Sequence, residues 1–212
     1  MIALAAERLL RGELQHTPDR RDLLVLGIAG SACLGLALGG SSGSAALAVF
    51  AAVKVPLLLA MTTVLCLPSF FVANTVLGLR DDFGAACRGL LAAQATLGLA
   101  LGALSPAVVW MSLSVFDPYA LTLLDAGVFA LASWAAQHVL RRHYEPLIRR
   151  DARHRLALRG WLVLFAFAGV QLAWVLRPFR GTAGFAVQFL RPEALEQNAY
   201  VVLLEHFARM LR

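Results

Sequence analysis

Lysine is nearly absent from this sequence, and charge of either sign is scarce. Only 15% of the 212 residues are charged and 59% are hydrophobic, whereas a soluble domain usually has about 25% charged residues. The mean hydropathy is +0.71. This balance excludes an ordinary soluble globular domain and places the chain among membrane proteins. Lys54 is the sole lysine, so arginine carries almost all of the positive charge.

Cysteine is also scarce, and its spacing excludes the common cysteine-based sites. Cys33, Cys66 and Cys87 are odd in number and form no CxxC pair, so neither a disulfide framework nor a zinc site is expected. His143 and His154 lie outside any HExxH pattern, and we expect both to be solvated. We therefore expect no catalytic residue, no metal and no cofactor.

Long apolar runs are what the sequence has in abundance. A helix needs about 20 mostly apolar residues to cross a bilayer, and five segments qualify. They cover about 23–41, a stretch within 45–79, 88–112, 119–140 and 160–177. The second run is too long for one straight span, so we expect a kink at Pro56 and Pro68, and residues 68–79 could lie along the interface or re-enter the membrane.

The distribution of arginine predicts the orientation. Segment 141–159 holds seven arginines against Glu145 and Asp151, and short cytoplasmic loops carry such an excess. The sequence thus predicts an all-α polytopic membrane helix bundle of about five transmembrane helices, with the N-terminus cytoplasmic and the C-terminus outside. Heavy use of arginine, alanine and leucine indicates a GC-rich bacterial genome, hence a bacterial inner membrane.

The tryptophans offer a second indication of the same topology. Trp110 and Trp174 fall near the outer ends of their predicted spans, and Trp134 and Trp161 fall near the inner ends. Tryptophan is enriched at both membrane interfaces, so we expect all four to lie in aromatic belts.

Three regions follow from this topology. Residues 1–22 form a cytoplasmic amphipathic segment, and residues 23–178 form the transmembrane bundle with a cytoplasmic arginine-rich loop at 141–159. Residues 179–212 form an outer loop and an amphipathic C-terminal helix over 193–212, which is too charged to span and suits a surface or a partner.

Small residues recur at helical spacing in two of the spans, where they let helix backbones approach closely. The pattern leaves two interpretations open, packing within the bundle and contact with a partner or a second copy. The residues concerned are Gly27, Ser31, Gly35, Gly39, Gly98 and Gly102.

Polar side chains inside the predicted spans define a candidate polar centre. Counted from the outer face, Lys54 and Asp125 lie roughly 14 Å and 9 Å deep at 1.5 Å per residue, and Gln171 lies near the depth of Asp125. A charge in the membrane usually pairs, so we expect Lys54 to reach Asp125 by snorkelling. The pair could lock two helices together or serve transport.

Other motifs carry weaker indications. Gly40-Ser41-Ser42-Gly43 matches the GxSG pattern of rhomboid proteases, but no histidine lies at that depth. Asp81-Asp82 resembles half of a magnesium-diphosphate motif, without the further acids, and we expect it to form an interfacial cluster with Arg80 and Arg88. We expect no nucleic-acid partner.

The arginine-rich segment can bind anionic lipid headgroups, at about 1 kcal/mol per basic residue, or a cytoplasmic protein. The candidate residues are Arg141, Arg142, Arg149, Arg150, Arg153 and Arg155.

GVQLAWVLRPFRG at 169–181, followed by FLRP and NAY, resembles a QLAWxLRPFxG-like signature of uncharacterised bacterial multi-pass proteins. The five-span layout also resembles Yip1-type membrane proteins, in architecture alone. Neither resemblance implies an activity. Within this stretch, Arg177, Phe179 and Arg180 lie at the predicted outer interface, where the arginines need anions from lipid, from Glu193 and Glu196, or from a partner.

These features favour a non-enzymatic integral inner-membrane subunit or scaffold of a larger complex, with protein partners or a homo-oligomer. The alternative is a small transporter or channel with a polar centre at Lys54 and Asp125.

Overall fold

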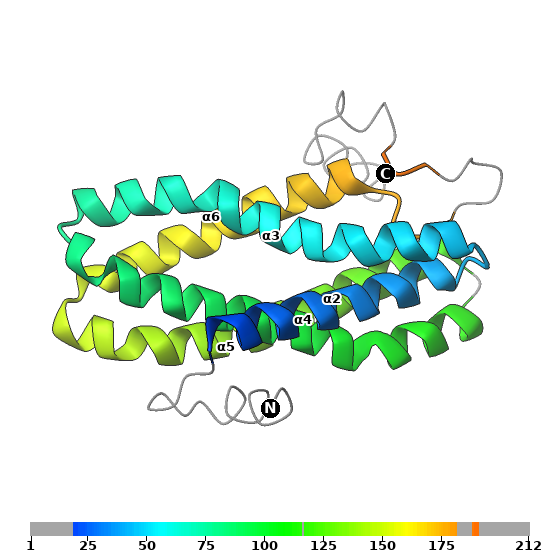
Figure 1. Cartoon of the computed structure of the whole chain (residues 1–212), viewed down its shortest axis with the longest axis horizontal. Helices are drawn as coiled ribbons and strands as arrows, with labels where there is room; N and C mark the ends of the chain where they lie inside the picture. Colours follow the sequence, from blue (N-terminus) through cyan, green and yellow to red (C-terminus); the bar gives the residue numbers. More distant parts are fainter. Residues whose placement is uncertain (1–18, 116, 182–187, 191–212) are drawn as a thin grey trace, which may run out of the picture.

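The computed structural model describes residues 19–115, 117–181 and 188–190, and Figure 1 shows their arrangement. The amphipathic segments predicted before residue 19 and over 193–212 lie outside the described residues.

The described chain is all α-helical, and the prediction of a polytopic membrane bundle is confirmed. The helices are α2 (Arg20–Gly40), α3 (Ala45–Val76), α4 (Phe83–Ser114), α5 (Pro118–Arg150) and α6 (Arg153–Leu176), with a short 3₁₀ turn, η2 (Arg80–Asp82), before α4. Five of the described helices are long and apolar enough to cross a membrane. The chain is therefore a multi-pass membrane protein in its architecture.

The second apolar run forms one continuous helix rather than a span with a re-entrant piece. α3 has 32 residues and contains both Pro56 and Pro68. In an apolar environment a helix end leaves backbone groups that no water can satisfy, so continuing past a proline costs less than breaking. α3 ends at Val76 because Gly78 adopts a positive φ of 74°, the left-handed geometry that closes a helix.

The arginine-rich segment is not a loop, which corrects the prediction for 141–159. α5 continues to Arg150, and α6 begins at Arg153. Asp151 closes the turn between them, because its carboxylate accepts a hydrogen bond from the backbone N–H of Arg153 at 2.9 Å. At 33 residues α5 is about 50 Å long, well beyond the roughly 30 Å hydrocarbon layer, so one end can carry arginines without burying them in lipid.

The helices form a curled row in the order α5, α4, α2, α3 and α6, with only light contact between α5 and α6. We call the end with residues 77–82 and 141–153 the arginine end, and the end with residues 41–44, 115–117 and 177–181 the serine-loop end. α2 starts partway along the bundle and runs to the serine-loop end, whereas α6 starts beside α5 at the arginine end and then diverges from α5 toward α3 (Figure 1).

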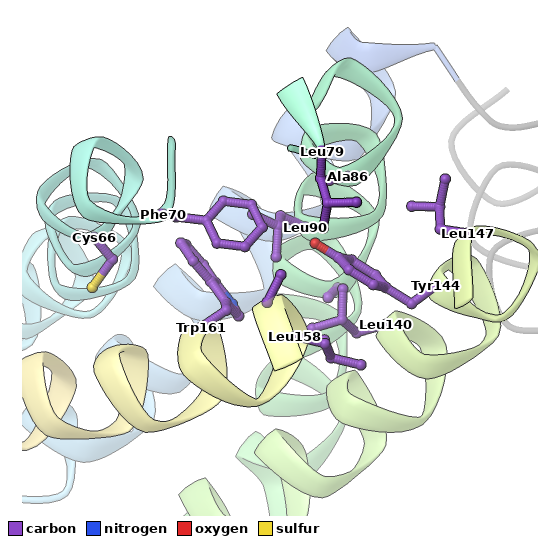
Figure 2. Close-up of a cluster of buried hydrophobic side chains, with 12 residues drawn as sticks. Cys66, Phe70, Leu79, Ala86, Leu90, Leu140, Tyr144, Leu147, Leu158 and Trp161 are labelled. Atoms are coloured by element: carbon purple, nitrogen blue, oxygen red, sulfur yellow. The ribbon is translucent and has the colours of Figure 1, made fainter. Parts of the chain in front are cut away.

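The buried apolar side chains of the described residues form three clusters, and the two larger ones lie toward opposite ends of the bundle. At the arginine end, Phe70, Leu90, Tyr144 and Trp161 bring α3, α4, α5 and α6 together (Figure 2). Toward the serine-loop end, α2 takes the place of α6. The buried residues there include Leu34, Leu38, Val55, Leu101, Val108 and Val128.

The predicted small residues lie at contacts within the bundle. A Cβ built on Gly98 would lie 2.2 Å from the backbone oxygen of Gly27, and one on Gly102 would lie 2.8 Å from the Cα of Gly30, so α2 and α4 touch through backbone. The small residues of α2 form a stripe, and in the second half of the helix this stripe faces α3. A Cβ on Gly35 would lie 2.2 Å from the backbone oxygen of Ala51 there.

The remaining members of the stripe fit the same division. A Cβ on Gly39 would lie 2.4 Å from the oxygen of Leu47 on α3. Ser31 is buried and its hydroxyl donates to the carbonyl of Gly27 at 2.6 Å.

The tryptophans do not form the uniform belts that the sequence predicts. Trp110 and Trp134 are 68% and 65% exposed, as expected for side chains that face lipid. Trp161, by contrast, is buried in the cluster of Figure 2, where its ring lies 5.1 Å from that of Phe70. Trp161 is buried because α6 contacts both α3 and α5, so its ring fills the core between these helices.

Candidate functional site

The serine-loop end is closed by residues 177–181, which we call the plug. α6 ends at Leu176, and Arg177 is extended with φ −58° and ψ 152°. A proline disfavours helical geometry in the residue before it, and Pro178 follows Arg177. The chain therefore leaves the helix axis and meets α2, α3, α4 and α5.

Arg180 is the best-connected residue of the plug. Its Nε and Nη2 donate to the two carboxylate oxygens of Asp125 on α5, at 2.5 and 2.6 Å. The side chains are only 19% and 20% exposed. A bidentate pair of this kind is the strongest form of side-chain recognition of a carboxylate.

Two serine hydroxyls complete the environment of Arg180. Its Nη1 donates to Ser41 Oγ at 2.9 Å and to Ser112 Oγ at 2.7 Å. The hydroxyl of Ser41 donates its own hydrogen to the carbonyl of Leu38, and the hydroxyl of Ser112 donates to the carbonyl of Val108. Since a hydroxyl oxygen retains accepting lone pairs, both serines can serve the guanidinium.

Lys54 holds the plug from α3. The side chain is fully buried, and its Nζ donates to the backbone oxygen of Pro178 at 2.9 Å. The same Nζ lies 5.1 Å from the centre of the Phe189 ring, a cation–π distance. Lys54 thus binds the chain that returns after α6, which explains why a lysine lies in an otherwise apolar helix.

Apolar and backbone contacts also attach the plug to the helices. Phe179 packs against the buried cluster at this end, in the space that α6 does not reach. The backbone N–H of Gly181 donates to Ser42 Oγ at 2.7 Å, and a Cβ at Gly181 would lie 2.7 Å from Ser42 Cβ. The plug therefore contacts four helices and their connection through polar and apolar groups alike.

This geometry corrects the predicted pairing of Lys54 with Asp125. Both oxygens of Asp125 are bound by Arg180, whereas Lys54 binds a carbonyl of the plug. Counting depth along each span could not reveal a third charge arriving from beyond the last span. Gln171 is half-buried on α6, and among the described residues no hydrogen bond joins it to either charge.

The predicted outer-interface residues also differ from expectation. Arg180 and Phe179 point into the bundle and find their partners there, so neither needs a lipid or a protein. Arg177 is half-buried, and its guanidinium carbon lies 3.4 Å from the centre of the Trp174 ring. Glu193 and Glu196, the other anions considered, lie outside the described residues.

A second polar contact lies at the arginine end. His154 is fully buried rather than solvated, and its Nε2 lies 3.1 Å from a carboxylate oxygen of Asp82. The other oxygen of Asp82 lies 3.8 Å from Arg150. Asp82 thus joins the start of α4 to the start of α6, instead of pairing with Arg80 or Arg88 as expected.

The arginine-rich segment divides into paired and unpaired side chains. Arg149 pairs with Glu145, Arg150 with Asp82 and Arg153 with Asp151. Within the described residues, Arg141, Arg142 and Arg155 form no ion pair and no hydrogen bond from their side chains. Among all the residues that the structure describes, no group of His, Cys, Asp and Glu side chains is placed to hold a metal ion.

The chain matches no protein-family model, no curated protein and no solved structure. Two resemblances therefore stay predictions. One is that of residues 169–181 to a recurring bacterial signature, and the other is that of the layout to Yip1-type proteins. The site must therefore be interpreted from its own chemistry.

Proposed function

We propose that this protein is a non-enzymatic integral subunit or scaffold of a larger membrane complex, in a bacterial inner membrane. In this proposal the N-terminus is cytoplasmic and the C-terminus lies outside. The bundle serves as a mount for the C-terminal part of the chain, which meets a partner or a second copy.

The observation that carries the proposal is that the charged side chains inside the serine-loop end all bind the plug or its partner. Lys54, Asp125 and Arg180 all fasten the plug. A mount needs a fixed anchor for the chain it displays, and this network holds residues 177–181 against the helices.

The described connections between the helices support the same view. The connections at 41–44, 77–82 and 151–152 are only a few residues long. They offer little room for a soluble catalytic site, whereas a mount needs none.

The alternative, a small transporter or channel with its polar centre at Lys54 and Asp125, makes a different demand. Its charges must meet the cargo along a path. Here both residues bind the plug, so transport would require residues 177–181 to move away first.

The test is affinity purification from the native host in a mild detergent, with quantitative mass spectrometry of the proteins recovered. We would compare the wild type with Arg180→Ala and with a control, Arg88→Ala, which removes an exposed arginine at the opposite end of the bundle. The proposal expects defined partners, or a homo-oligomer, with the wild type and the control, and their loss with Arg180→Ala.

A wild-type protein recovered alone as a monomer would overturn the proposal. Uptake assays in proteoliposomes would then compare the wild type with Arg180→Ala. Transport that rises on loss of Arg180 would support the alternative.

A further inference from the structure

A groove of about 680 Å³ lies between α5 and α6 at the arginine end. Five arginines line it, three from α5 and two from α6. They are Arg141, Arg142, Arg149, Arg155 and Arg159. Arg159 is a new member of the group, because the sequence assigned it no role; its place on α6 opposite α5 appears only in three dimensions.

The positive charge of this groove is largely uncompensated within the described protein. Glu145 is the only acid in the lining, and it is bound by Arg149 at 2.6 Å. The other four arginines make no side-chain hydrogen bond or ion pair with any described residue. The nearby Arg150 and Arg153, which do have acidic partners, are not part of the lining.

The floor of the groove is apolar and faces the middle of the bundle. Ile148, Leu158 and Leu162 contribute to the lining. Beyond them α6 diverges from α5 and approaches α3, so the two helices that line the groove make only light contact (Figure 1). A ligand seated here would have its anionic part among the arginines and its apolar part against the apolar floor.

We propose that this groove binds one anionic phospholipid whose headgroup carries two phosphates. An amphiphile of that kind matches both parts of the lining. A guanidinium binds phosphate through two parallel hydrogen bonds, so four free arginines on two helices suit two phosphates better than one. Basic pockets between transmembrane helices are known to hold such headgroups. The inference is independent of the proposed scaffold role, because the groove lies at the opposite end of the bundle from the plug.

The experiment is native mass spectrometry of the purified full-length protein in a mild detergent, titrated with three lipids. Diphosphatidylglycerol has two phosphates, phosphatidylglycerol has one, and phosphatidylcholine has no net charge. We expect one saturable site for diphosphatidylglycerol, with affinity at least ten-fold above that for phosphatidylglycerol.

The variant Arg142→Gln/Arg159→Gln removes one free arginine from each helix. Each arginine near a membrane surface changes affinity roughly five-fold, so we expect a loss of about thirty-fold for the pair. The control Arg80→Gln/Arg88→Gln removes the same charge from exposed positions at the same end, outside the groove, and should change affinity less than about three-fold. Should the first variant fail to fold, Arg141→Gln/Arg155→Gln makes the same test.

Three results would overturn the inference. Equal losses of lipid affinity in the groove variant and in the control would mean that the lipid responds to the overall positive charge of this end and not to the groove. Equal affinity for phosphatidylglycerol would mean that two phosphates are not recognised. Displacement of the lipid by soluble pyrophosphate at equal affinity would mean a site for a free phosphate rather than for a lipid.

Discussion

At the scale of single residues, the main lesson comes from Arg180. Three charged side chains serve the serine-loop end, and the pair that forms is the one whose geometry is best. Arginine offers a planar fork that matches a carboxylate, whereas a lysine ammonium is a point charge. Asp125 therefore takes the arginine, and Lys54 takes a backbone oxygen for which one donor suffices.

The pairing can be tested with two double-mutant cycles. Arg180→Ala leaves a mostly buried carboxylate without its cation, and we expect a loss of about 3 kcal/mol in stability. The cycle of Arg180→Ala with Asp125→Ala should show a coupling energy above about 1.5 kcal/mol, and the cycle of Lys54→Ala with Asp125→Ala less than about 0.5 kcal/mol. Unfolding in detergent, followed by size-exclusion chromatography after heating, provides the measurement. A larger coupling for Lys54 than for Arg180 would contradict the structure.

Asp151 gives a pH-dependent prediction at the same scale. Hydrogen bonds from the side chain and backbone of Arg153 hold the pKa of the Asp151 carboxyl below its usual value. A lowered pKa contributes stability above the pKa of the unfolded state, and this is lost as the pH falls through the folded value. Asp151→Asn should therefore melt slightly below the wild type at pH 7, and the difference should shrink as the pH falls below the ordinary aspartate pKa of about 3.9. Melting curves across this range test it; a gap that widens in acid would contradict it.

At the scale of helices, close contact through glycine decides which helices are neighbours. α2 lies against α4 at its first half and against α3 at its second half, because successive glycines on one stripe face different partners. In lipid no difference in hydrophobicity drives helices together, so backbone approach and van der Waals contact must do so. Gly30, which is outside the predicted set, is among the most crowded: a Cβ there would lie 2.2 Å from the oxygen of Gly98.

Matched glycine substitutions test this account. Gly98→Ala would place a methyl group 2.2 Å from the backbone oxygen of Gly27, and overpacking of this kind costs about 1–3 kcal/mol. Gly160→Ala has nothing within 4 Å of the new Cβ and should be neutral, or stabilising by up to about 1 kcal/mol, because alanine favours helix. Melting temperatures in the same detergent compare the two. Equal effects would mean that the α2–α4 contact is looser than the structure has it.

At the scale of the whole molecule, the two ends of the bundle differ in charge and in construction. The serine-loop end is closed by the plug, and the arginine end carries the basic groove. Helices of 32 and 33 residues exceed the thickness of the hydrocarbon layer, so parts of them extend into the headgroup region. Arginines at that level favour the cytoplasmic side.

The orientation is tested by labelling single cysteines in a variant that lacks Cys33, Cys66 and Cys87. Gly40→Cys lies at the serine-loop end and Ala152→Cys at the arginine end, and both positions are exposed. An impermeant maleimide should label Gly40→Cys in intact cells, and Ala152→Cys only after permeabilisation. The reverse pattern would place the arginine end outside and contradict the orientation.

The sequence by itself determined the class of this protein and the number of its spans. Apolar runs of sufficient length have one stable solution in lipid, a helix with its own hydrogen bonds satisfied, so the five helices follow from composition and length. It also singled out Lys54, Asp125 and the stretch around Arg180 as unusual, because charge within or beside apolar runs is costly.

Only the tertiary structure decided which of these residues meet. The ends of α3 and α5, the burial of Trp161 and His154, and the pairing of Arg180 with Asp125 all depend on where helices cross and where the chain turns back. Such contacts join residues far apart in the chain, and no periodicity records them. The basic groove has the same origin: its charge is visible in the sequence, but its shape exists only because α6 leaves α5 for α3.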